Sequence, residues 1–117
     1  MDERLEKALE FSNFMTTLSN QRRVLQEQFY QSLIYYYNGC QFTVDRELIN
    51  YTNMLVEHDN TTDVVFLDDN DLPIIIEDVS KFLIDIKDIY FQALNTFYTE
   101  YNKLKSNRSI EKLVEYD

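Results

Sequence analysis

The two side chains with the most obvious chemistry in this sequence are its single cysteine, Cys40, and its single histidine, His58. A histidine can activate a thiol by taking its proton, but a third group must then orient the histidine. No such group is evident, so we expect no catalytic site and no enzymatic activity. The alternative, an enzyme, requires one polar pocket that holds Cys40 and His58 together. One cysteine also excludes an intramolecular disulfide and is typical of a reducing compartment.

Metal coordination is the second chemistry to consider. Glu57, His58 and Asp59 are adjacent in sequence and would point in different directions on a helix, whereas zinc needs ligands that converge. The run from Asp68 to Asp71 is acidic, but as a calcium loop it lacks the glycine of the sixth position and has Val79 where glutamate is required. We therefore expect no metal and no other cofactor. A single glycine also excludes glycine-rich phosphate and dinucleotide loops.

The charge distribution restricts the partners. The chain carries 21 acidic and 11 basic residues, and residues 45–100 contain 13 of the acids and 3 of the bases, which accounts for the whole net charge of −10. Such a surface repels phosphate backbones, so we do not expect nucleic acid as a partner. Two interpretations stay open: a solvated acidic face, or a docking surface for a basic protein. The residues expected to form an acidic tip are Asp68, Asp69 and Asp71.

Hydrophobic spacing predicts the elements that position these groups. Residues 3–37 predict one long helix, because apolar side chains recur at steps of three and four without glycine or proline. Asn38-Gly39 would end this helix, with Gly39 in the left-handed cap conformation. A second helix is expected from Thr43, as its N-cap, to the polar stretch that begins at His58.

The period then changes. Residues 64–67 and 72–76 are short, β-branched runs around four turn-forming residues, which predicts a β-hairpin. A last long helix is expected over residues 78–105, with Asp78 as its N-cap. Residues 106–109 would break it before a short terminal helix.

Together these elements predict a mainly helical α+β fold in one domain, residues 1–117, with two long antiparallel helices, a shorter helix and one β-hairpin. Each long helix carries more apolar surface than one neighbour can cover. We therefore expect a homodimer or higher oligomer that completes a helical bundle. The residues expected in the core and self-association surface are Phe11, Met15, Leu18, Leu25, Phe29, Ile86, Tyr90, Phe97 and Tyr101.

Residues 1–15, the Tyr36-Tyr37-Asn38-Gly39 turn, the Asp68-Asp69-Asn70 hairpin and residues 107–114 resemble a family of small acidic proteins of marine myoviruses, mainly those that infect cyanobacteria. The resemblance spans nearly the whole chain and implies an origin rather than a mechanism. We interpret the chain as a non-enzymatic phage interaction protein, such as an oligomeric adaptor or assembly factor. It would act in the host cytoplasm or in the virion. The charged start and the lack of a long apolar run predict neither a signal peptide nor a membrane span.

Residues 36–39 followed by 42–46 also resemble part of the phage recombination mediator family, which loads a recombinase on single-stranded DNA. This implies an alternative function, a recombination accessory factor acting on single-stranded DNA or its binding proteins. Members of that family carry more lysine and arginine before the tyrosines, where this chain has Gln28, Gln31 and Ser32. Because few basic residues accompany the tyrosines, we expect them to serve the core and an interface rather than to stack on bases.

Overall fold

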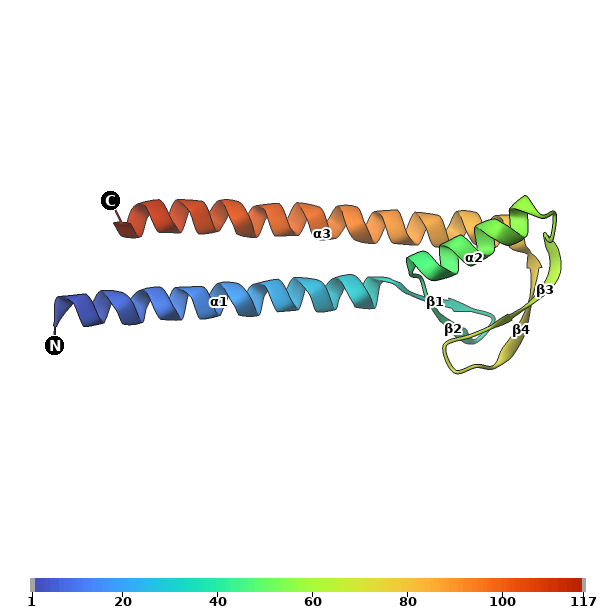
Figure 1. Ribbon diagram of the computed structural model, residues 1–117, viewed down its shortest axis with the longest axis horizontal. Helices are drawn as coiled ribbons and strands as arrows, with labels where there is room; N and C mark the ends of the chain where they lie inside the picture. The colour runs from blue at the N-terminus through green and yellow to red at the C-terminus, as the bar shows by residue number, and fades with distance from the viewer. Residues whose placement is uncertain (1, 117) are drawn as a thin grey trace. The chain divides into compact units, whose positions relative to one another are not determined.

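The computed structural model describes the backbone of residues 2–116 and the side chains of residues 2–106 (Figure 1). Within this range the fold is mainly helical with antiparallel hairpins, which confirms the expected α+β class. Two compact units are present: unit 1 contains α1 as far as Phe29 and α3 from Thr96 onward, and unit 2 is Tyr30–Asn95. The single domain stays a prediction. The elements are α1 (Glu3–Ser32), β1 (Ile34–Tyr37), β2 (Cys40–Thr43), α2 (Arg46–Glu57), β3 (Thr62–Leu67), β4 (Pro73–Asp78) and α3 (Val79–Tyr116).

Unit 2 is built around an aromatic cluster centred on Phe82 of α3. Phe82 is 1% exposed, and its ring centroid lies 5.4 Å from those of Phe42 in β2 and Phe66 in β3. The rings of Tyr35 and Tyr37 in β1 lie 6.0 and 5.7 Å from the same ring. Tilted and edge-to-face pairs at these distances stabilise beyond the burial of area. One helix side chain therefore joins both hairpins to α3. The other buried apolar residues of unit 2 are Leu33, Val44, Leu55, Ile76, Val79, Leu83, Ile86 and Ala93.

The expectation of one helix over residues 3–37 is wrong for its last part, because α1 ends at Ser32 and β1 follows. The side chains of β1 alternate: Tyr35 and Tyr37 are half-buried, while Tyr36 is 67% exposed. Aromatic residues fit a half-buried pleated surface well. The tyrosines therefore follow the two-residue period of a strand: the rings of Tyr35 and Tyr37 pack against the core, and the ring of Tyr36 faces water.

The Asn38-Gly39 turn joins β1 to β2, with Tyr37 opposite Cys40. Asn38 and Gly39 have positive φ angles of 48° and 80°, as a two-residue type I′ turn requires. Gly39 thus adopts the left-handed conformation expected of it, but in a hairpin turn rather than at a helix end. This hairpin is additional to the one that the sequence predicted.

Helix α2 begins two residues later than expected. Its N-cap is Asp45, whose carboxylate accepts a hydrogen bond from the N–H of Leu48 at 2.8 Å. The expected N-cap, Thr43, ends β2 instead, and its hydroxyl donates to the Asp69 carboxylate at 2.7 Å. The helix ends at His58, as predicted. Tertiary pairing of Thr43 therefore moves the start of the helix to the next good capping residue.

The second hairpin confirms the prediction for residues 64–76. Strands β3 and β4 are antiparallel, with Val65 opposite Ile75 and Leu67 opposite Pro73. Pro73 is the first residue of β4, where a strand tolerates the missing N–H.

Helix α3 follows β4 directly. Asp78 is its N-cap, as predicted, because its carboxylate accepts the N–H of Lys81 at 3.1 Å. The break expected at residues 106–109 is wrong, since the backbone continues as helix to Tyr116. Serine and asparagine each lower helix propensity by less than about 0.7 kcal/mol, too little to end a helix without proline or glycine. The side chains of the expected terminal helix lie outside the described residues.

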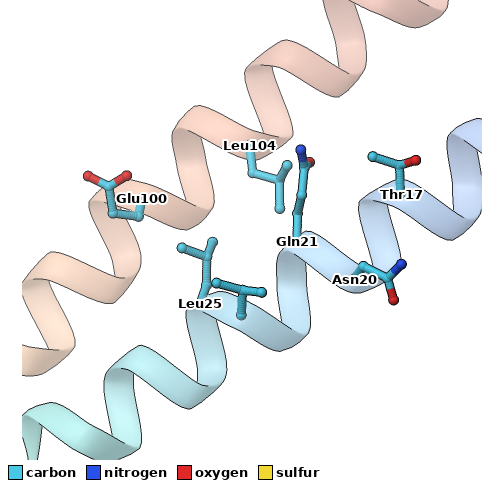
Figure 2. Close-up of a pocket in the computed structure, with 7 residues that line it drawn as sticks. Thr17, Asn20, Gln21, Leu25, Glu100 and Leu104 are labelled. Atoms are coloured by element: carbon cyan, nitrogen blue, oxygen red, sulfur yellow. The ribbon is translucent and has the colours of Figure 1, made fainter.

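Unit 1 contains two helical segments that run antiparallel. Phe29 of α1 packs against Phe97 of α3, with ring centroids 5.1 Å apart. Leu25, one turn earlier on α1, faces Glu100 and Leu104 farther along α3 (Figure 2). The seam between the segments is therefore formed by residues at helical spacing on each.

Candidate interaction surfaces

The seam of unit 1 contains most of the residues expected at the self-association surface. Leu18 is 4% exposed, and Met15, Leu25 and Phe29 are half-buried. The burial of these side chains takes place within one chain, against the second helical segment. They therefore contribute to the core of the helix pair before any second copy is considered.

A cavity of about 430 Å³ lies between the two segments. Figure 2 shows Leu25 and Leu104 pointing into the space between the helices, with the polar side chains of Thr17, Gln21 and Glu100 around them. One carboxylate with neutral groups offers no pair for acid–base chemistry. The cavity leaves aliphatic side chains incompletely packed, as expected where a bundle lacks further helices.

Large apolar side chains on both segments are more than a third exposed. Phe11 and Tyr101, both expected at the interface, are 41% and 38% exposed. A two-helix unit buries one face of each helix and leaves the others in water. Among the side chains of unit 1 that the structure describes, the further exposed large apolar residues are Leu5, Leu9, Val24 and Tyr98.

Two of the residues expected in the core and self-association surface belong to unit 2. Ile86 is fully buried in its core, and Tyr90 is half-buried with its ring 5.9 Å from that of Phe91. The regular spacing along α3 predicted one continuous surface. In the structure, the first part of that stripe covers the hairpins of unit 2 and the later part belongs to the helix pair of unit 1.

The expected acidic tip contains one buried carboxylate. Asp68 is 6% exposed, and its Oδ1 accepts hydrogen bonds from the N–H groups of Asn70 and Leu72 at 2.9 and 2.8 Å. Its own N–H donates to the Leu72 carbonyl at 3.0 Å. Asp68 therefore organises the turn between β3 and β4, as acidic side chains commonly do in turns.

Asp69 connects this turn to the first hairpin. Its carboxylate accepts hydrogen bonds from Gln41 Nε2 at 3.1 Å, from the Thr43 N–H at 2.9 Å and from the Thr43 hydroxyl at 2.7 Å. The Asp69 N–H donates in return to the Gln41 carbonyl at 2.9 Å. Asp71, in contrast, is exposed, with a positive φ of 60°. Of the three predicted tip residues, Asp71 presents its carboxylate most freely.

The two candidate catalytic residues have different surroundings. Cys40 is half-buried in β2, and the pKa of its thiol is raised by burial and by the charge and hydrogen bond of Asp68. A raised pKa keeps a thiol protonated and weakly nucleophilic. His58 is exposed at the end of α2, where its backbone N–H donates to the carbonyls of Met54 and Val56. The neighbour that sets the chemistry of Cys40 is thus a carboxylate, not the imidazole.

A cavity of about 270 Å³ in unit 2 lies beside the aromatic cluster. The pKa of Tyr35 is raised mainly by burial, and to a smaller extent by electrostatic interaction with Asp85 and Tyr37. The Tyr35 phenol therefore stays neutral. Acids and a lysine share the cavity with the rings, and the N-terminus of α3 adds partial positive charge. The cavity therefore favours neither sign of ligand. Its lining is Tyr35, Tyr37, Glu77, Asp78, Lys81, Phe82 and Asp85.

One surface that the sequence reasoning missed is the outer face of the β3–β4 hairpin. Val65 and Ile75 are opposite each other on it and are 57% and 53% exposed. The sequence did contain evidence for this exposed apolar face. Both strands are apolar without alternation, and because a two-stranded sheet packs on a core with one face only, the other face must present apolar side chains to water. We name this patch the hairpin patch; it comprises Val65, Leu67, Pro73 and Ile75.

Comparisons with known proteins add no relatives. No family model matches the sequence, and the comparisons with curated proteins and with solved structures find no significant match. Among the side chains of residues 2–106, no three histidine, cysteine, aspartate or glutamate residues are grouped to hold a metal ion. No helix in the described part of the chain is long and apolar enough to span a bilayer.

Proposed function

We propose that this chain is a non-enzymatic interaction protein that works as a homo-oligomer, with its long helices packed against those of a second copy. The observation that carries the proposal is the apolar surface that α3 leaves exposed. Along this helix, Phe91, Leu94, Tyr98 and Tyr101 recur at steps of three, four and three, and they are between 37% and 68% exposed.

This spacing is that of a helix seam. Residues at alternating steps of three and four lie along one side of a helix and pack into the holes of a facing helix. A half-exposed large apolar side chain gains about 1 kcal/mol when the rest of its surface leaves water. Several such residues on each of two copies, together with the incompletely packed cavity of Figure 2, supply a driving force for a four-helix arrangement.

The mass of the protein in solution tests this proposal. Light scattering at micromolar concentration should give about twice 14.1 kDa. The double variant Phe91→Gln, Tyr98→Gln should give the monomer mass, because glutamine keeps helix propensity but removes apolar surface. The matched control Tyr36→Gln changes a residue that is 67% exposed on β1 and should leave the mass of the oligomer unchanged. A wild-type monomer across this range would reject the proposal.

The resemblance to small acidic proteins of marine myoviruses supports a role during infection of a bacterium, in the host cell or in the virion. The alternative, a recombination accessory factor, predicts binding to single-stranded DNA that weakens steeply with salt. A titration of single-stranded DNA at low salt that shows no binding would remove this alternative and leave the self-association proposal intact.

A further inference from the structure

The hairpin patch lies on a regular and well-defined surface. In the β3–β4 ladder, Val65 is opposite Ile75 and Leu67 is opposite Pro73, so these four side chains share the outer face. The intervening residues, such as Phe66 and Ile76, are buried in unit 2 at 3% and 0% exposure. Because the inner side chains of the hairpin are packed in the core of unit 2, the side chains on its outer face are held in fixed positions.

The outer face is apolar although it faces water. Leu67, near the turn, is 60% exposed, and Val65 and Ile75 are also more than half exposed. Single exposed apolar residues are ordinary, but a contiguous group surrounded by polar residues is typical of a binding surface. A solvated hairpin would normally alternate apolar and polar residues, and this one does not.

Carboxylates surround the hairpin patch. Residues 62–78 contain six acidic and no basic residues. Three of the six, Asp68, Asp69 and Asp78, are occupied by hydrogen bonds within unit 2. Asp63 and Glu77 are exposed at the open end of the hairpin, and Asp71 is exposed at its turn. An apolar centre therefore lies between exposed negative charges at both ends.

This charge pattern distinguishes between the possible occupants. A second copy of the hairpin would bring six acids against six acids with no cation on either side, and like charges at close range oppose association. A segment with apolar side chains flanked by lysine or arginine complements both features, because its chain buries the patch and its charges meet the carboxylates.

We propose that the outer face of the β3–β4 hairpin docks a basic, apolar segment of a partner protein, with the hairpin patch as the contact and Asp63, Asp71 and Glu77 as the charged rim. This goes beyond self-association, since the surface belongs to unit 2 and a second copy is disfavoured on it. The partner is thus a different protein from the one that covers the helices.

The experiment uses the full-length chain and three short synthetic peptides of the same length. The first alternates lysine and leucine, the second lysine and serine, and the third glutamate and leucine. Fluorescence anisotropy should show binding of the lysine–leucine peptide that weakens with salt, and at least about tenfold weaker binding of the other two.

Variants of the surface provide the control. Val65→Thr with Ile75→Thr keeps β-branched side chains of similar shape and should weaken binding of the lysine–leucine peptide about tenfold or more. Asp63→Asn with Glu77→Gln should weaken it several-fold and reduce its salt dependence. Tyr36→Thr, on the exposed face of the other hairpin, should leave it unchanged.

Four results would overturn this proposal. These are no binding of the lysine–leucine peptide, equal binding of all three peptides, equal loss in the Tyr36→Thr control, and a lower oligomer mass in the Val65→Thr, Ile75→Thr variant. The last result would mean that a second copy occupies the patch. The mass of the wild-type protein, measured in parallel, reports on the self-association proposal independently of any peptide.

Discussion

Replacing Asp69 by asparagine should destabilise unit 2, although Asp69 is an exposed residue of a turn. The Asp69 carboxylate accepts three hydrogen bonds from the first hairpin, one from Gln41 and two from Thr43, over 2.7 to 3.1 Å. An asparagine side chain has one acceptor oxygen and places an amide donor where the second carboxylate oxygen stood. If the amide nitrogen takes the Oδ1 position, the bond from the Thr43 N–H is lost. If it takes the Oδ2 position, the bonds from Gln41 and the Thr43 hydroxyl are lost.

The magnitude follows from these contacts. A hydrogen bond contributes about 0.5–1.5 kcal/mol net, and bonds to a charged acceptor contribute more when they are shielded from water. Because Asp69 is exposed, solvent screening brings its bonds toward the neutral range. Losing one or two of them, with a donor left facing a donor, gives an expected loss of about 2 kcal/mol in the free energy of unfolding.

Urea denaturation followed by circular dichroism measures this loss, with Asp71→Asn as the matched control. Asp71 has φ 60°, a conformation that asparagine also tolerates, so the control should change stability by less than about 0.5 kcal/mol. A double-mutant cycle with Thr43→Val should show a coupling of about 1 kcal/mol, because these residues share a bond. Equal stability of the two asparagine variants would refute the role assigned to Asp69.

Two further predictions concern unit 2. Phe82→Ala removes a ring that is 1% exposed and contacts four aromatic neighbours. Thermal unfolding should therefore show that the free energy of unfolding falls by about 3–5 kcal/mol. A fall of less than about 1 kcal/mol would contradict the central place of Phe82 in the core. The raised pKa of Cys40 predicts that alkylation by iodoacetamide at pH 8 is slower in the folded protein than in urea, where the thiol titrates at its ordinary pKa. Asp68→Asn should accelerate the reaction in the folded protein by lowering that pKa, and an unchanged rate would exclude the carboxylate as a cause.

Local features of the sequence were enough to predict several elements. Two of these elements are the N-cap of α3 at Asp78 and the β3–β4 hairpin. Each depends on residues that are close in sequence, so the local residue pattern is enough to predict it. The helix break at residues 106–109 was a wrong local inference, since weak helix formers alone do not end a long helix.

The end of α1 was decided by tertiary contacts. Tyr35 to Tyr37 fit a helical stripe as well as a strand, and a short aromatic run does not distinguish the two periods. Asn38-Gly39 serves both as a helix stop and as a hairpin turn. The core around Phe82 favours the strand, because that period directs Tyr35 and Tyr37 toward the same ring.

The roles of the acids also depend on the tertiary structure. By itself the sequence determined that residues 62–78 are strongly acidic, and it predicted a hairpin over residues 64–76 and excess apolar surface on the long helices. Only the folded chain separates Asp68 and Asp69, which bond to backbone and side-chain donors, from Asp63, Asp71 and Glu77, which face water. The physical reason is that charge is a property of composition, whereas access to a carboxylate depends on donors that are distant in the chain and become neighbours on folding.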